Sequence, residues 1–236
     1  ELNTWARGRS PRELAALVAR LCLALEYVHR RGFVHADLKA SNVIVASTDE
    51  GPRAVLTDFG LARRRGAAGD GLAGTLFHLA PEALLGAPPQ PAADLFALGV
   101  MLHELCVGRR APAREFYGRF PASDFFEASR TRPEDVPELL RELVVELLER
   151  DPARRPASAE SVGRRLAQAG GAAELFRERR VELRWPLLFG REEWLDRWVA
   201  ASRASAALRL EWLAAPADEA VAALAEAAAL RTTLAD

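Results

Sequence analysis

The sequence predicts a mainly α-helical fold of the α+β class, with one short strand pair near its middle. Apolar residues in segment 11–31 recur at intervals of three and four, the spacing of a long amphipathic helix. Segment 93–108 is apolar on nearly all sides, which is typical of a helix buried in a core. Between these helices, the runs NVIVA and RAVLT are rich in β-branched residues and are joined by turn formers, which predicts a hairpin.

The predicted elements carry start and stop signals. Ser10 followed by Pro11 fits an N-cap and a first helical position, and Gly32 fits the end of that helix. Segments 136–150 and 158–171 have the spacing of two further amphipathic helices. Segment 63–70 is rich in Gly, Ala and Arg without periodicity, and it predicts an irregular loop.

Composition excludes several classes of protein. The 236 residues carry a net charge of -1, so we expect no electrostatic capture of nucleic acid or of an anionic membrane. The chain has no apolar run of membrane-spanning length and no basic-then-apolar leader, so we expect a soluble, cytoplasmic protein. Cys22 and Cys106 lie far apart in helical patterns without CxxC spacing, and we expect both to be buried thiols.

The stretch HADLKASN concentrates residues that are rare elsewhere in the chain. Lys39 is the only lysine among 32 lysines and arginines, and Asn42 is one of two asparagines. This stretch leads into the first predicted strand and TDFG follows the second, so Asp37, Lys39, Asn42 and Asp58 should lie close together. Carboxylate and amide oxygens suit Mg²⁺, while an aspartate beside an ammonium suits orienting a hydroxyl near a phosphate.

At this point the chain resembles the larger, C-terminal lobe of a eukaryotic-like, bacterial-type Ser/Thr protein kinase. That family shows H-R-D-L-x-x-x-N, then D-F-G, then A-P-E. Here the corresponding segments are HADLKASN at 35–42, DFG at 58–60 and APE at 80–82, in the same order. The resemblance implies a kinase-like fold, ATP with Mg²⁺ as the phosphoryl donor, and a protein substrate.

The resemblance also implies a role for each matching residue. Asp37 is expected to be the catalytic base, and Lys39 to contact the transferred phosphoryl group. Asn42 and Asp58 are expected to hold the Mg²⁺ ions, and Thr75, in GTLFHLAPE, to face the substrate. A compact ammonium fits between a carboxylate and a phosphate where a guanidinium does not, which explains a lone lysine in an arginine-rich chain.

Six further residues are expected to hold the site without taking part in the chemistry. Asp94 should bond the backbone of the catalytic loop, and Arg155 should pair with the glutamate of A-P-E. His35 and Phe59 should stack on each other, as the resemblance implies. The full set of expected structural residues is His35, Phe59, Gly60, Glu82, Asp94 and Arg155.

The chain departs from the family pattern in its regulatory positions. Ala36 stands where the family has an arginine that receives a phosphate on the activation loop. Between Asp58 and Glu82, Thr75 is the only Ser, Thr or Tyr. We therefore expect activity that is not switched by phosphorylation of this segment. His78 replaces the family's tyrosine, and it either alters peptide selection or repacks the loop.

The smaller, N-terminal lobe has no counterpart in this sequence. No Gly-rich loop precedes HADLKASN, and no second lysine exists to hold the ATP phosphates. We expect residues 1–170 to be the kinase C-lobe of a longer chain, inactive alone, because transfer depends on positioning by both lobes. Residues 171–236 are expected to be a helical extension, available to a helical partner.

Two alternative functions compete with an active protein kinase. A pseudokinase scaffold would be marked by loss of Asp37, Asn42 or Asp58, and all three are present. A small-molecule phosphotransferase of kinase-like fold usually lacks a G-T-x-x-x-x-A-P-E segment and an R-P helix. Both features occur here, as GTLFHLAPE and RRP, so a protein substrate is favoured.

Overall fold

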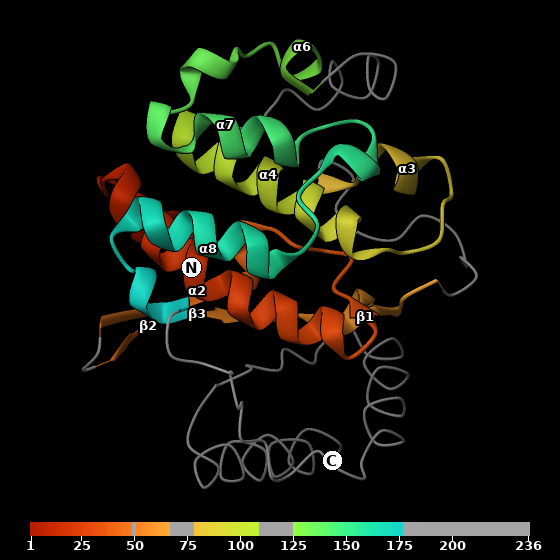
Figure 1. Cartoon of the computed structure of the whole chain (residues 1–236), viewed down its shortest axis with the longest axis horizontal. Helices are drawn as coiled ribbons and strands as arrows, with labels where there is room; N and C mark the ends of the chain where they lie inside the picture. Colours follow the sequence, from red (N-terminus) through yellow and green to blue (C-terminus); the bar gives the residue numbers. More distant parts are fainter. Residues whose placement is uncertain (49–50, 67–77, 109–124, 177–236) are drawn as a thin grey trace, which may run out of the picture.

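The computed structural model describes residues 1–48, 51–66, 78–108 and 125–176 (Figure 1). Within these residues the fold is mostly helical with a few short antiparallel strands, as the sequence predicts. The helices are α1 (Leu2–Ala6), α2 (Pro11–Arg30), α3 (Pro81–Leu84), α4 (Pro91–Val107), α6 (Phe125–Ser129), α7 (Glu138–Leu147) and α8 (Ala159–Gly170). The strands are β1 (Phe33–Val34), β2 (Val43–Thr48), β3 (Gly51–Leu56) and β4 (Arg63–Arg64). Single 3₁₀ turns connect them: η1 (Ala40–Asn42), η2 (Phe59–Leu61), η4 (Pro133–Asp135), η5 (Pro152–Arg154) and η6 (Ala173–Phe176).

Helix α2 is the central support of the described fold. Ser10 caps its N-terminus in a reciprocal capping box with Glu13, and Gly32 follows its end at a φ of 78°. One face of α2 packs on α8 and the other on strand β3, so the helix is sandwiched between them (Figure 1). Gly163 of α8 permits this approach, because a Cβ there would lie 2.8 Å from Cβ of Cys22.

Helices α4 and α7 form the layer on the opposite side of α8 and α2 from the hairpin (Figure 1). Helix α4 is buried on nearly all sides, as its sequence predicts, and it ends at Gly108 with a φ of 73°. Gly99 allows close contact with α7, since a Cβ at that position would lie 2.8 Å from Cβ of Leu147. The buried polar exceptions on α4, Asp94 and His103, are therefore conspicuous within an apolar helix.

The predicted hairpin is present as β2 and β3. The strands pair antiparallel, with Val43 opposite Leu56 at the end nearest the candidate site. A difference from the sequence prediction lies just beyond, in segment 63–70. There Arg63 and Arg64 form strand β4, paired antiparallel with β1, because β1 offers an open edge that periodicity does not reveal.

The two cysteines are free, but only one is buried as predicted. Cys22 is 0% exposed within α2, and burial raises the pKa of its thiol. Cys106 lies near the end of α4 and is only partly covered, so the expectation of full burial is wrong for it. Burial still raises the pKa of the Cys106 thiol to about 12, which leaves it a poor nucleophile at neutral pH.

Candidate active site

Hydrogen bonds to the carboxylate of Asp94 hold the backbone of the loop that carries the candidate catalytic residues. This side chain is 1% exposed, and its Oδ2 accepts a 2.8 Å bond from the backbone N–H of His35. Its Oδ1 accepts from the N–H of Ala36 at 2.9 Å. The contact expected between Asp94 and the loop backbone is therefore present, and it holds Ala36 at a φ of 63°.

A residue that the sequence reasoning did not single out completes this anchor. His29, in the last turn of α2, places its Nε2 2.8 Å from Oδ2 of Asp94, with both side chains buried. The bond ties α2 to α4 through the carboxylate that also holds the loop. The signal that could have found it is the position of His29 four residues after Leu25, on the apolar face of the predicted helix.

His35 is the first residue of the loop, and its side chain is a neutral imidazole. It is 0% exposed, its Nε2 lies 2.9 Å from the carbonyl of Thr57, and its Nδ1 accepts the N–H of Asp37 at 3.4 Å. Nε2 is therefore the protonated nitrogen. Burial lowers the pKa of His35, although the carboxylate of Asp94 partly opposes the shift. The ring also packs edge-on against Phe59, with centroids 4.8 Å apart.

Asp37, Lys39 and Asn42 meet in one hydrogen-bonded group. The ammonium of Lys39 donates to Oδ2 of Asp37 at 2.7 Å, and Nδ2 of Asn42 donates to the same oxygen at 3.0 Å. Asn42 also donates to the backbone carbonyl of Asp37 at 2.9 Å. Asp37 is only 6% exposed, so these donors compensate a carboxylate that has lost most of its water.

The end of the hairpin brings Asp58 to this group. The N–H and the hydroxyl of Thr57 both donate to the carbonyl of Asn42, at 2.9 and 3.0 Å, which joins the two strand ends. Asp58 follows directly and adopts a left-handed backbone, with φ 60° and ψ 65°, before η2 begins. Gly60 lies within η2, where a Cβ would lie 3.4 Å from Oδ1 of Asp58. The four residues selected from the sequence are therefore neighbours.

The orientation of Asn42 fits a role as a ligand of Mg²⁺. Nδ2 donates to the backbone carbonyl and to Oδ2 of Asp37, so Oδ1, which accepts from the Ser41 hydroxyl at 3.5 Å, is the atom suited to coordinate a cation. No cluster of three or more His, Cys, Asp or Glu side chains suited to a metal occurs among the described residues. Asn42 and Asp58 alone are a sparse oxygen set, of the kind that Mg²⁺ completes with phosphate and water.

Arg155 forms the ion pair expected with Glu82. Its side chain is 0% exposed and binds both carboxylate oxygens of Glu82, at 2.6 and 2.8 Å. The other donors reach three backbone carbonyls, and the guanidinium lies over the ring of Phe96 at 4.9 Å. The pair fastens α3 to α4 and to the turn before η5, so it holds the segment that faces the loop.

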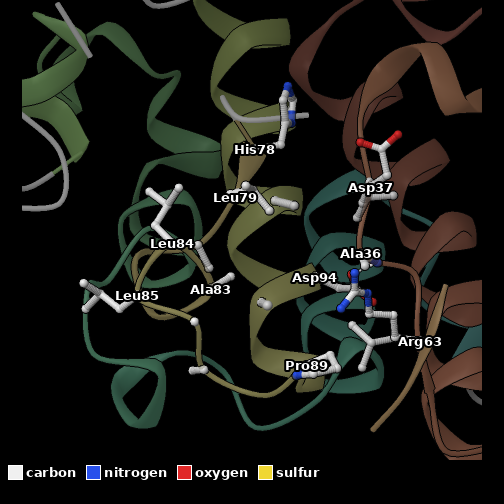
Figure 2. A pocket seen from close by; sticks show the side chains of 17 residues that line it. Ala36, Asp37, Arg63, His78, Leu79, Ala83, Leu84, Leu85, Pro89 and Asp94 are labelled. Carbon is white, nitrogen blue, oxygen red and sulfur yellow. Dashed lines mark hydrogen bonds between the residues drawn. The ribbon is translucent and has the colours of Figure 1, made fainter. Parts of the chain in front are cut away.

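A cavity of about 430 Å³ opens between the loop, strand β4 and helix α3. Figure 2 shows Asp37 and His78 toward one end of it and Arg63 beside Ala36 nearer the other. His78 is 5% exposed, and its Nε2 lies 3.5 Å from Oε2 of Glu104 on α4. Its placement therefore agrees with repacking of the segment against α4.

Two expectations fall outside the described residues. Thr75 lies in segment 67–77, and most of the predicted extension 171–236 lies beyond residue 176. The described start of that extension, η6, packs against α8 and buries Phe176. Among the described helices, none combines the length and the apolar character that crossing a membrane requires.

Comparison with known proteins gives the family. A family model described as the protein kinase domain matches residues 2–166, most of the chain. The chain therefore belongs to the protein kinase domain family.

Its relatives include bacterial serine/threonine-protein kinases. It is 34% identical to PkaA of Streptomyces coelicolor over 161 residues, which cover 66% of this chain and 29% of that protein. It is 35% identical to PknK of Mycobacterium tuberculosis over 175 residues, which cover 70% of this chain and 16% of that protein. Against pkn2 of Myxococcus xanthus the identity is 31% over 182 residues, covering 70% and 21%. The chain thus spans less than a third of the length of these relatives.

Proposed function

We propose that this chain forms the larger lobe of a serine/threonine protein kinase, which transfers the γ-phosphate of ATP to hydroxyl groups of protein substrates. The observation that carries the proposal is the shared carboxylate oxygen of Asp37, bonded by both Lys39 and Asn42. It joins a carboxylate, an ammonium and an amide in one hydrogen-bonded group, and these groups suit a base, a cation and an oxygen ligand. The family membership and the names of the relatives support the same reaction class.

Asp37 is the group that would orient and deprotonate the substrate hydroxyl. Its Oδ2 accepts from Lys39 and Asn42, and on this proposal its Oδ1 would receive the proton of the substrate hydroxyl. His35 does not compete for this proton, because its Nε2 is directed to the Thr57 carbonyl and its ring is fully buried.

Lys39 would place its positive charge where negative charge develops on the phosphoryl oxygens. Asn42 and Asp58 would hold Mg²⁺, and Mg²⁺–ATP, when bound, supplies the phosphoryl group and neutralises its oxygens. The protein's part is then to fix these side chains, through Asp94 and the hairpin, before the substrate arrives.

We further propose that a second cation for the ATP phosphates comes from a part of the protein outside these residues. The only lysine of the sequence donates to Asp37, which leaves no other lysine to bind the donor phosphates. The matched regions cover only 29% and 16% of the lengths of PkaA and PknK, which supports the proposal that this chain is part of a longer protein. On this proposal, residues 1–236 alone transfer no phosphate.

The test is a radiolabelled phosphate-transfer assay on the full-length protein that contains this chain, with Mg²⁺–ATP and a generic protein substrate. The Asp37→Asn variant keeps the shape of the side chain and removes the base, so we expect a loss of at least about 100-fold in kcat. Asp151→Asn is the matched control, because Asp151 is exposed and only caps η5, a task asparagine also performs.

Label on serine or threonine that disappears in Asp37→Asn and persists in Asp151→Asn supports the proposal. Undiminished transfer by Asp37→Asn would contradict the role of Asp37. Folded full-length protein that labels nothing would favour a signalling scaffold without kinase activity.

A further inference from the structure

The cavity beside Asp37 has an exposed apolar side chain at its rim. Leu85 and Leu139 are the two exposed large hydrophobic side chains among the described residues, at 75% and 41%. Leu85 comes directly after α3 and lines the cavity (Figure 2). Exposed apolar surface beside a hollow of this kind is a mark of ligand binding, whereas Leu139 lies on α7 and outside the lining.

Most of the remaining lining is aliphatic and comes from separate parts of the fold. Figure 2 shows Ala83, Leu84 and Leu85 on one side of the cavity, and Ala36 and Asp94 on the other. The volume of about 430 Å³ lies within the range of roughly 300–1,000 Å³ that small-molecule sites have. An apolar molecule that enters this cavity leaves water, which favours its binding. The aliphatic lining residues used in this argument are Val34, Leu38, Leu79, Ala83, Leu84 and Ala97.

The aspartates and the arginine of the lining already have partners within the protein. Asp94 accepts from two backbone N–H groups and lies 2.8 Å from Nε2 of His29. Asp37 accepts from the ammonium of Lys39 at 2.7 Å. Arg63 also takes part in an interaction within the protein and is not a free cation. A charged ligand would therefore lose its hydration without gaining an unpaired partner, and a neutral ligand would not carry that cost.

We propose that this cavity binds a neutral, mainly aliphatic small molecule, and that the bound molecule keeps protein substrate away from Asp37. The second half of the inference rests on the proposed kinase function. Among the described residues, Asp37 lines the cavity, whereas Lys39, Asn42 and Asp58 do not. A molecule in the cavity therefore contacts the candidate base without contacting the residues expected to bind Mg²⁺–ATP. It competes with the protein substrate and leaves the nucleotide site open.

The first experiment is isothermal titration calorimetry on the full-length protein. Its three probes share one hydrocarbon cage and differ in charge: adamantanol, adamantane carboxylate and adamantylammonium. We expect adamantanol to bind at least about ten-fold more tightly than either ion, because burial removes the hydration of the ions without replacing it. Its binding should also show a negative change in heat capacity, the sign expected when apolar surface is buried.

Variants of the lining assign the binding to this cavity. Ala83→Leu fills part of the cavity and should weaken adamantanol binding by at least about ten-fold. Ala169→Leu is its matched control, because Ala169 is also a partly buried alanine but lies on α8, outside the lining. Leu85→Ala should weaken binding by about three-fold or more, and Leu139→Ala should leave it unchanged. Unfolding temperatures show that each variant is folded.

The second experiment measures phosphate transfer by the full-length protein with and without adamantanol. We expect the KM for a generic protein substrate to rise, while kcat and the KM for ATP stay unchanged. Ala83→Leu should remove this inhibition, and Ala169→Leu should retain it.

Equal affinities for the three probes, or binding that both Ala83→Leu and Leu85→Ala leave unchanged, overturns the inference. Inhibition that competes with ATP also overturns it, because the molecule would then lie among Lys39, Asn42 and Asp58. Binding that leaves the KM for the protein substrate unchanged overturns it as well, and the proposed function stands in each of these cases. Absence of transfer without any probe contradicts the proposed function itself, and calorimetry then still decides whether the cavity binds the neutral probe.

Discussion

The ion pair between Arg155 and Glu82 should be the costliest polar contact to break in the described fold. The perturbation is Glu82→Ala, which leaves a guanidinium with a fully buried side chain facing three carbonyls and no anion. Removing one partner of a buried pair costs about 3–5 kcal/mol, and the 18% exposure of the Glu82 side chain favours the lower end. For a domain of this size, about 3 kcal/mol lowers the unfolding temperature by roughly 6–12 °C.

The assay is urea unfolding followed by circular dichroism, with Glu146→Ala as the matched control. Glu146 also binds an arginine through both oxygens, but the side chains of Arg165 and Glu146 are 39% and 36% exposed. Solvent screens that pair, so its loss should cost at most about 1 kcal/mol. Replacing the buried pair together, by Arg155→Met with Glu82→Leu, should recover much of the lost free energy of unfolding. Equal losses for Glu82→Ala and Glu146→Ala would refute the reasoning.

Three further outcomes follow from backbone geometry, packing and protonation. Ala36→Gly should raise the free energy of unfolding by about 0.5–1 kcal/mol in urea titration, because Ala36 has a φ of 63° that glycine adopts without a Cβ clash. A loss of stability would show that the Ala36 methyl packs favourably. Gly99→Ala should cost about 1–2 kcal/mol in the same assay despite a better helix propensity, since its Cβ would meet Leu147 at 2.8 Å. A neutral result would mean that α4 and α7 separate without cost. Burial lowers the pKa of His35, so the unfolded state binds more protons; stability should be full above the ordinary value of 6.5 and fall as pH drops below it. Thermal unfolding scans from pH 8 to pH 5 measure this, and a His35→Gln variant with the same pH slope would contradict the assignment.

Sequence reasoning reached the main elements because their signals are local. The Ser10 cap, the apolar spacing of α2 and the turn residues between β2 and β3 each act within a few residues of chain. It missed the short helices α1, α3 and α6 and the strands β1 and β4, whose few residues carry no pattern of their own. Two residues cannot show a period, so no pattern could have revealed β4.

The candidate site divides in the same way. Asp37, Lys39, Asn42 and Asp58 were proposed from residue type and motif order, because the kinase pattern carries those groups in that order. His29 was not found, since it reaches Asp94 from a separate element, α2, and the cavity that Arg63 of β4 lines was not predicted either. Their contribution depends on which elements pack together, and that is a property of the folded chain.

The sequence by itself determined the family, the helix-rich class of fold and the identity of the four chemical groups. These depend on local spacing and on side-chain chemistry, which the order of residues states directly. Only the tertiary structure decided that one carboxylate, Asp94, joins α2, α4 and the loop, and that a cavity lined in part by Arg63 adjoins Asp37. Contacts across 58 to 65 residues of chain arise from burying apolar faces together, and local patterns do not encode which partners meet.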